Sequence, residues 1–134
     1  MLNARRVVAT GNPGFPCRVS LVDAELGEEL LLLPFEHQSA HSPYKASGPI
    51  FVRNNARQEF AVPGTVPDYV RTRLMSVRAY DAAHIMTDAA VCEGNAVEAV
   101  LRSMFDSKDT AYIHLHNAKR GCFSCAVRRA SAAA

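Results

Sequence analysis

Residues 111–127 read AYIHLHNAKRGCFSCAV, and this stretch decides the fold of the C-terminal part of the chain. Apolar and polar side chains alternate over its first six residues, which is the pattern of a β-strand with one buried face. Residues 117–121 are typical of a turn, and the alternation resumes over residues 122–127. The stretch therefore predicts a hairpin of two antiparallel strands.

In the first of these strands, alternation assigns the side chains to two faces. Residues two apart share a face, so Ile113 and Leu115 are expected to point together into the core. His114 and His116 then lie together on the opposite face. The sequence thus predicts a histidine-bearing face that has a hydrophobic core behind it.

The returning strand is expected to extend both faces. Its apolar set, predicted to join the core, is Phe123, Cys125 and Val127. Cys122 and Ser124 alternate with that set and are expected beside the two histidines. This face, with the turn above it, is the densest group of reactive side chains in the sequence.

The remaining pattern predicts an α+β fold, a mainly antiparallel sheet with one principal helix packed on it. The helix is expected over residues 96–105, with Asn95 as its N-cap and Glu98 completing a capping box. Residues 37–49 are polar and rich in serine, and are expected to form a long loop. The other predicted elements are strands at residues 15–21, 29–36, 50–53, 74–80 and 85–91 and one helical turn at 68–71.

Length and composition indicate a single globular domain of 134 residues, with frayed N-terminal residues and a disordered tail from about residue 130 to 134. The net charge of +2 argues against a nucleic-acid or membrane-surface partner. No stretch has the length of a membrane span, and no secretory signal is present, so we expect a cytoplasmic protein with its four cysteines as thiols. A homodimer is compatible with the sequence.

A pocket is expected between the loop at residues 37–49 and the histidine-bearing face. Arginine side chains bind carboxylate or phosphate through two parallel hydrogen bonds, so the arginines near this loop favour a small polar or anionic ligand. The predicted ligand-binding residues are Arg18, His37, Tyr44, Arg53 and Arg120.

Two other functions stay open from the sequence. An enzyme would use His114 or His116 as a general base and Cys122 as a nucleophile, or the two histidines as ligands of a divalent metal such as zinc, with Cys122 or His37 as a third. A non-catalytic interaction protein would use the same face to contact another protein. Cys125 lies three residues from Cys122, so the two are expected on opposite faces and are not predicted to form a redox pair.

Several separated motifs carry a resemblance to a known family. They are PCRVSL at residues 16–21, EHQ at 36–38, PYKASGPIFVR at 43–53 and IHLHNAKRGC at 113–122. Over residues 4–129 the chain resembles a bacterial family known as domain of unknown function 1203. The resemblance implies histidine and cysteine where His37, His114, His116 and Cys122 stand, and it implies no activity, substrate or cofactor.

Overall fold

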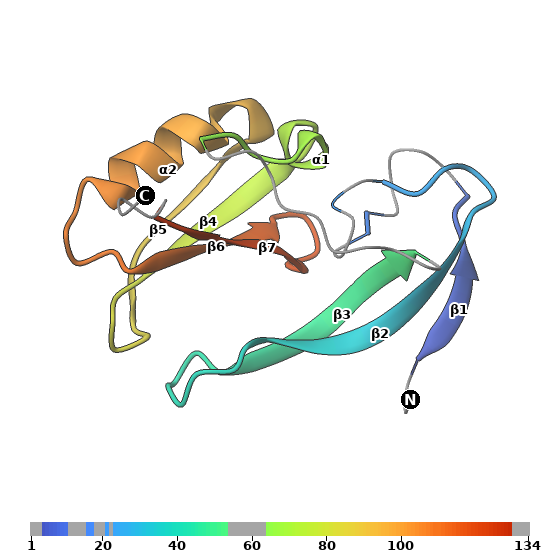
Figure 1. Cartoon of the computed structure of the whole chain (residues 1–134), viewed down its shortest axis with the longest axis horizontal. Coiled ribbons are helices and arrows are strands. Elements are labelled where there is room, and N and C mark those ends of the chain that lie inside the picture. The colour runs from blue at the N-terminus through green and yellow to red at the C-terminus, as the bar shows by residue number, and fades with distance from the viewer. Residues whose placement is uncertain (1–3, 11–15, 18–20, 22, 54–63, 130–134) are drawn as a thin grey trace, which may run out of the picture.

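Two antiparallel sheets and one main helix make up the fold (Figure 1). The structure is a computed structural model that describes residues 4–10, 16–17, 21, 23–53 and 64–129. The α+β class is confirmed at this level, although there are two sheets where the sequence suggested one. Most of the strand predicted at residues 15–21, the N-terminal residues 1–3 and the tail at 130–134 lie outside the described residues.

The larger sheet has four strands in the order β5-β4-β6-β7. Their bounds are β4 Leu74–Tyr80, β5 Met86–Glu93, β6 Tyr112–Asn117 and β7 Phe123–Arg128. The helix α2 (Val97–Phe105) follows a short 3₁₀ turn, η1 (Gly94–Ala96), and packs on one face of this sheet. The hairpin predicted from residues 111–127 is therefore confirmed as β6 and β7.

The main hydrophobic core lies between α2 and this sheet. Alternation along β4 and β6 sends every second side chain toward the helix, as predicted for Ile113 and Leu115. Both of these side chains are fully buried. The other core residues on these elements are Met75, Val77, Ala79, Val97, Leu101 and Met104.

The start of the helix differs from the prediction. Ala96 is the N-cap of α2 and no side chain caps it, so the capping box predicted from Asn95 and Glu98 is wrong. The Glu98 carboxylate instead accepts a hydrogen bond from Arg71 (2.6 Å), at the end of the short helix α1 (Asp68–Arg71). An ion pair to a neighbouring helix has therefore replaced the local cap.

The smaller sheet has the order β1-β2-β3, with β1 at Arg5–Val8, β2 at Glu29–Gln38 and β3 at Ala46–Arg53. The sequence did not predict β1. The long loop predicted at residues 37–49 is wrong, because β2 and β3 continue into it and leave only residues 39–45 as a connection. Pro34 on β2 lies directly opposite Pro49 on β3. Two opposed prolines are tolerated in a sheet when both ring nitrogens point away from the hydrogen bonds between the paired strands.

The turn end of the β2–β3 hairpin lies against the four-stranded sheet, on the face opposite α2 (Figure 1). The Gln38 side chain donates a hydrogen bond of 3.0 Å to the Tyr112 hydroxyl, and the Tyr44 ring contacts the Tyr80 ring at 5.9 Å. This docking covers the face that carries His114 and His116. Within the described residues, no helix has the length and apolar character needed to cross a membrane.

Candidate functional site

Three histidines meet where the β2–β3 hairpin covers the four-stranded sheet. We call His37, His114 and His116 the histidine cluster. All three rings contact the ring of Phe123, with centroid distances of 5.2 Å for His37 and His114 and 5.6 Å for His116. The structure thus brings together the three histidines that the sequence singled out.

A β-bulge places Phe123 among these rings. Leu115 pairs with Cys125, but the next residue, His116, pairs with Phe123, so the ladder skips Ser124. The skipped residue reverses the alternation at the start of β7, and the predicted faces of Phe123 and Ser124 are therefore wrong. Ser124 points to the helix side, where its Oγ lies 2.8 Å from the hydroxyl of buried Tyr69. Cys125 packs on the main core, as predicted.

Arg78 is the charged residue at this site that sequence reasoning missed. It lies on β4 directly opposite His114, half-buried, and its Nε donates a hydrogen bond of 3.1 Å to Ser76 Oγ. Cross-strand neighbours such as these have Cβ atoms about 5 Å apart. The alternation of β4 would have identified it, because Ser76 and Arg78 share the face opposite Met75 and Val77.

Burial disfavours the charged form of two of these histidines, His37 and His114. His114 is 6% exposed, and burial, reinforced by His116, His37 and Arg78, lowers its pKa to about 4. Burial, and next Arg78, also lowers the pKa of His37, while a hydrogen bond with the Phe35 backbone opposes the shift. The Nδ1 atoms of His37 and His114 are buried and have no hydrogen-bond partner among the described residues.

The tautomer of neutral His116 follows from its hydrogen bond. Its Nδ1 lies 2.9 Å from the carbonyl oxygen of Gly121, in the turn between β6 and β7. A carbonyl only accepts hydrogen bonds, so Nδ1 carries the proton and donates it. Nε2 of the neutral ring therefore carries the lone pair.

A short hydrogen-bonded chain borders the cluster. The Tyr112 hydroxyl accepts from Gln38 and lies 2.8 Å from Nδ1 of His84, in the turn between β4 and β5. The Tyr112 ring also stacks on Tyr80 and contacts His114. This chain joins the hairpin to two elements of the larger sheet.

Of the predicted arginines, the two that the structure describes, Arg53 and Arg120, do not converge on this cluster. Arg53 forms an ion pair with Glu28 and lies opposite Leu30, seven residues before His37 along β2, or about 23 Å at the rise of a strand. Arg120 is exposed in the turn after β6 and makes no hydrogen bond or ion pair with the described residues. Arg18 lies outside the described residues. Tyr44, 37% exposed, reaches the site through Tyr80.

Cys122 is half-buried just before β7, and its carbonyl accepts a hydrogen bond from the Asn117 backbone. Its thiol makes no hydrogen bond with the described part of the chain. That part also contains no group of three or more His, Cys, Asp or Glu side chains that could hold a metal ion. The metal set predicted from His114, His116 and a third ligand is therefore not assembled.

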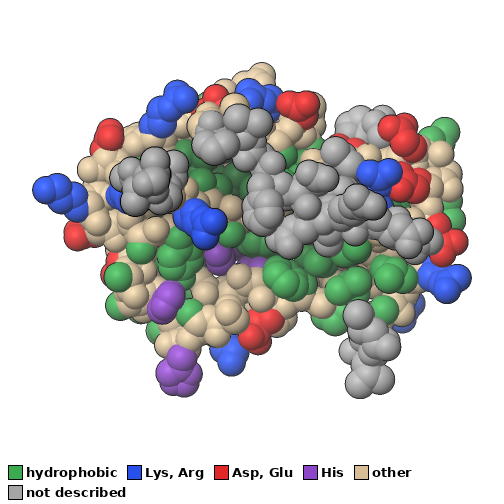
Figure 2. All heavy atoms as spheres, in the orientation of Figure 1, with side chains coloured by type: hydrophobic (Ala, Val, Ile, Leu, Met, Phe, Trp, Pro, Cys, Tyr) green, Lys and Arg blue, Asp and Glu red, His purple; other side chains and the backbone are tan. Residues whose placement is uncertain are grey.

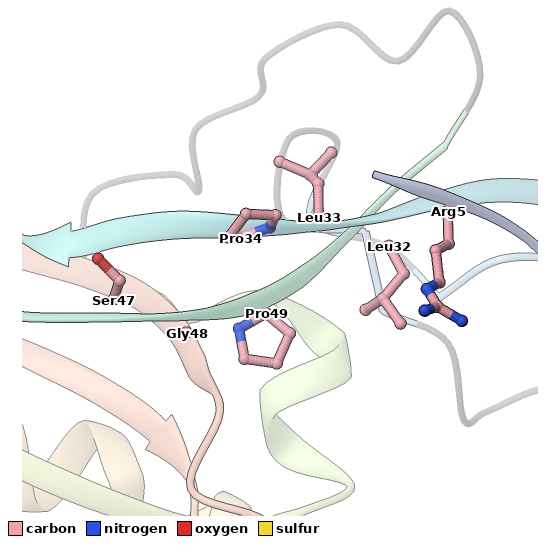
Figure 3. A pocket seen from close by; sticks show the side chains of 7 residues that line it. All are labelled: Arg5, Leu32, Leu33, Pro34, Ser47, Gly48 and Pro49. Carbon is pink, nitrogen blue, oxygen red and sulfur yellow. The ribbon is translucent and has the colours of Figure 1, made fainter. Parts of the chain in front are cut away.

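Two cavities of the described structure have no member of the histidine cluster in their linings. One, of about 350 Å³, lies on the smaller sheet between Arg5, Leu32 and Pro49 (Figure 3). A second, of about 580 Å³, lies between α2 and β7. Neither is lined by a predicted site residue. In Figure 2, parts of histidine side chains are visible near the centre of the face, recessed among hydrophobic and other side chains.

Comparison with known proteins matches the chain to a protein family. The family model described as "Protein of unknown function (DUF1203)" covers residues 14–129, which include the histidine cluster, Arg78 and Cys122. No curated protein matches the chain. No solved structure matches it either. Because the match spans most of its length, the chain belongs to this family of proteins of unknown function, DUF1203.

Proposed function

We propose that this domain binds a small anionic ligand at the histidine cluster, between the β2–β3 hairpin and the four-stranded sheet. The observation that carries this proposal is the pair of buried Nδ1 atoms, on His37 and His114, that have no hydrogen-bond partner among the described residues. A buried polar atom without a partner costs about 1–3 kcal/mol. A ligand that hydrogen-bonds both atoms would recover this energy on binding.

Arg78 favours an anion over a metal ion. Burial is the main cause of the lowered pKa of His37 and of His114, and the positive charge of Arg78 adds to both shifts, so a positive potential reaches both imidazoles. That potential would repel a divalent cation and attract a carboxylate or phosphate group. Arg78 thus takes the role that the sequence suggested for Arg18 and Arg53.

The same geometry supports binding better than catalysis. A general base works best when its pKa lies near the operating pH, and the pKa of His114 is about 4. A nucleophilic cysteine needs a base within hydrogen-bond distance, and the Cys122 thiol has no such bond with the described residues.

Entry requires the hairpin to move away from the sheet. The Nδ1 atoms of His37 and His114 are closed to solvent. Among the described residues, the contacts that hold this end of the hairpin include a hydrogen bond from Gln38 to Tyr112 and ring contacts of Phe35, His37 and Tyr44. We propose that these contacts break and re-form during ligand exchange.

The test is a titration of the purified protein with sodium acetate and inorganic phosphate at constant ionic strength, followed by amide NMR shifts and calorimetry. We expect saturable shifts in β2, β4 and β6, and at least a tenfold loss of affinity in Arg78→Gln. Arg120→Gln is the matched control, because it removes the same charge from an exposed turn, and it should bind like the wild type. Equal affinity in the two variants, or no saturable binding, would refute the proposal.

A further inference from the structure

We infer that the ligand is a small monoanion that also carries a hydroxyl group, that is, a short hydroxycarboxylate. This inference rests on the proposed function and adds the chemical class of the ligand. It follows from the charge, the hydrogen-bonding capacity and the spacing of the groups at the histidine cluster.

The charges of the side chains at the histidine cluster favour a ligand with a single negative charge. Arg78 is the one cation that acts on both His37 and His114 in the described part of the chain, and both imidazoles are neutral at pH 7. The other side chains in ring contact with His114 are Tyr80, Tyr112 and Phe123, all uncharged. A dianion would leave one negative charge without a partner in a buried site, which is strongly unfavourable.

The Nδ1 atoms of His37 and His114, which have no hydrogen-bond partner among the described residues, favour a ligand that carries a hydroxyl group. A neutral imidazole has one N–H and one lone pair, so each Nδ1 either donates or accepts. A carboxylate oxygen only accepts, so it satisfies one of these two states. A hydroxyl both donates and accepts, and can therefore satisfy His37 or His114 in either tautomer.

The spacing of the rings limits the size of the ligand. The centroids of His37 and His114 each lie 5.2 Å from that of Phe123, so the two imidazoles are no farther apart than twice this distance. Arg78 is the direct cross-strand neighbour of His114, so the anionic group lies close to one of the two imidazoles. A skeleton of three or four carbons is long enough to reach these groups.

Matched probes separate the contributions of charge and hydroxyl groups. Glycerate and propionate have three carbons and one carboxylate each, but only glycerate has hydroxyls. Malonate has the same carbon count and two carboxylates. Inorganic phosphate supplies an oxyanion that carries hydroxyls without a carbon skeleton. Each is titrated into the wild type, Arg78→Gln, His114→Phe and Arg120→Gln at pH 7.5.

We expect glycerate to bind at least tenfold more tightly than propionate, malonate or phosphate, with the affinity lost in Arg78→Gln and kept in Arg120→Gln. His114→Phe, which keeps a ring of similar shape without nitrogen, should bind glycerate and propionate equally. His37→Phe provides a second variant should His114→Phe lack the wild-type circular dichroism spectrum.

The outcomes distinguish this inference from the proposed function. Binding of propionate as tight as that of glycerate, dependent on Arg78, would overturn the hydroxyl inference and leave the anion site standing. Tightest binding of malonate would overturn the monoanion inference alone, and tightest binding of phosphate would overturn the assignment of a carboxylate on a carbon skeleton. The absence of any binding that depends on Arg78 would overturn both.

Discussion

The ring of His37, on β2, lies edge-on to the ring of His116, on β6, with centroids 5.0 Å apart and planes at 82°. The two residues are separated by most of the chain and belong to different sheets. Their contact joins the β2–β3 hairpin to the larger sheet through ionisable side chains. The docking of the hairpin should therefore respond to pH.

The stability of the protein is expected to fall in mild acid. His114 has a pKa of about 4 in the folded protein and an ordinary value of 6.5. Between these values the unfolded chain binds more protons, so the stabilisation is complete above pH 6.5 and is lost as the pH falls toward 4. Urea unfolding should show a decrease of up to about 3 kcal/mol across this window.

Two variants test whether His114 is responsible for the predicted loss of stability in mild acid. His114→Phe should show a much smaller decrease in unfolding free energy between pH 6.5 and pH 4. His41→Phe alters an exposed histidine in the hairpin turn and should retain the wild-type dependence. An unchanged dependence in His114→Phe would contradict the assignment.

Phe123→Ala should cost about 3–5 kcal/mol, the range for truncating a buried phenylalanine. The ring is 9% exposed and contacts all three members of the histidine cluster as well as Phe35. Urea unfolding measures the loss, and amide hydrogen exchange should become fastest in residues 35–46. Cys125→Ala, on the core face of the same strand, is the control that should leave exchange in the hairpin unchanged.

Removal of the Tyr112 hydroxyl should loosen the hairpin without unfolding the sheet. Tyr112→Phe removes one acceptor of the buried Gln38 amide, which also hydrogen-bonds the Tyr80 hydroxyl, and the lost hydrogen bond should cost about 0.5–1.5 kcal/mol. Amide exchange near Gln38 should accelerate several-fold. Tyr44→Phe removes an exposed hydroxyl that makes no hydrogen bond with the described residues, and equal acceleration there would argue against the role of Tyr112.

Gly94→Ala should destabilise the protein by about 3 kcal/mol or more, because an added Cβ would lie 2.0 Å from the backbone oxygen of Val70. Gly48→Ala is the matched control. Its Cβ would make ordinary contact, 3.9 Å from the His37 ring, and alanine is better tolerated than glycine in a strand. Thermal unfolding should show a large decrease in Tm for the first variant and little change for the second.

Regular alternation made much of the larger sheet predictable. Every second residue of β6 faces the helix without interruption, so the positions of Ile113, His114, Leu115 and His116 followed from sequence parity. Alternation predicted the wrong face for Ser124, because a β-bulge interrupts the pairing there. The position of a bulge depends on the partner strand and cannot be recognised from the sequence pattern of one strand alone. Phe123 was therefore assigned to the wrong face.

Tertiary contacts explain the other differences. Glu98 has the spacing of a capping residue, but its carboxylate binds Arg71 from another helix. Residues 37–49 have the composition of a loop, yet pairing between β2 and β3 extends through both ends of this segment. The position of Arg78 was not predicted because it depends on the pairing of β4 with β6, which the pattern of β4 alone does not specify.

The opposed prolines at positions 34 and 49 have a consequence for how copies of this protein behave in a crowded solution. On the outer side of β3, an edge strand of the described sheet, Pro49 lies where a strand from another molecule would need an N–H donor. Such edges resist intermolecular strand pairing. The hairpin that carries His37 is therefore protected along β3 against acting as a template for aggregation.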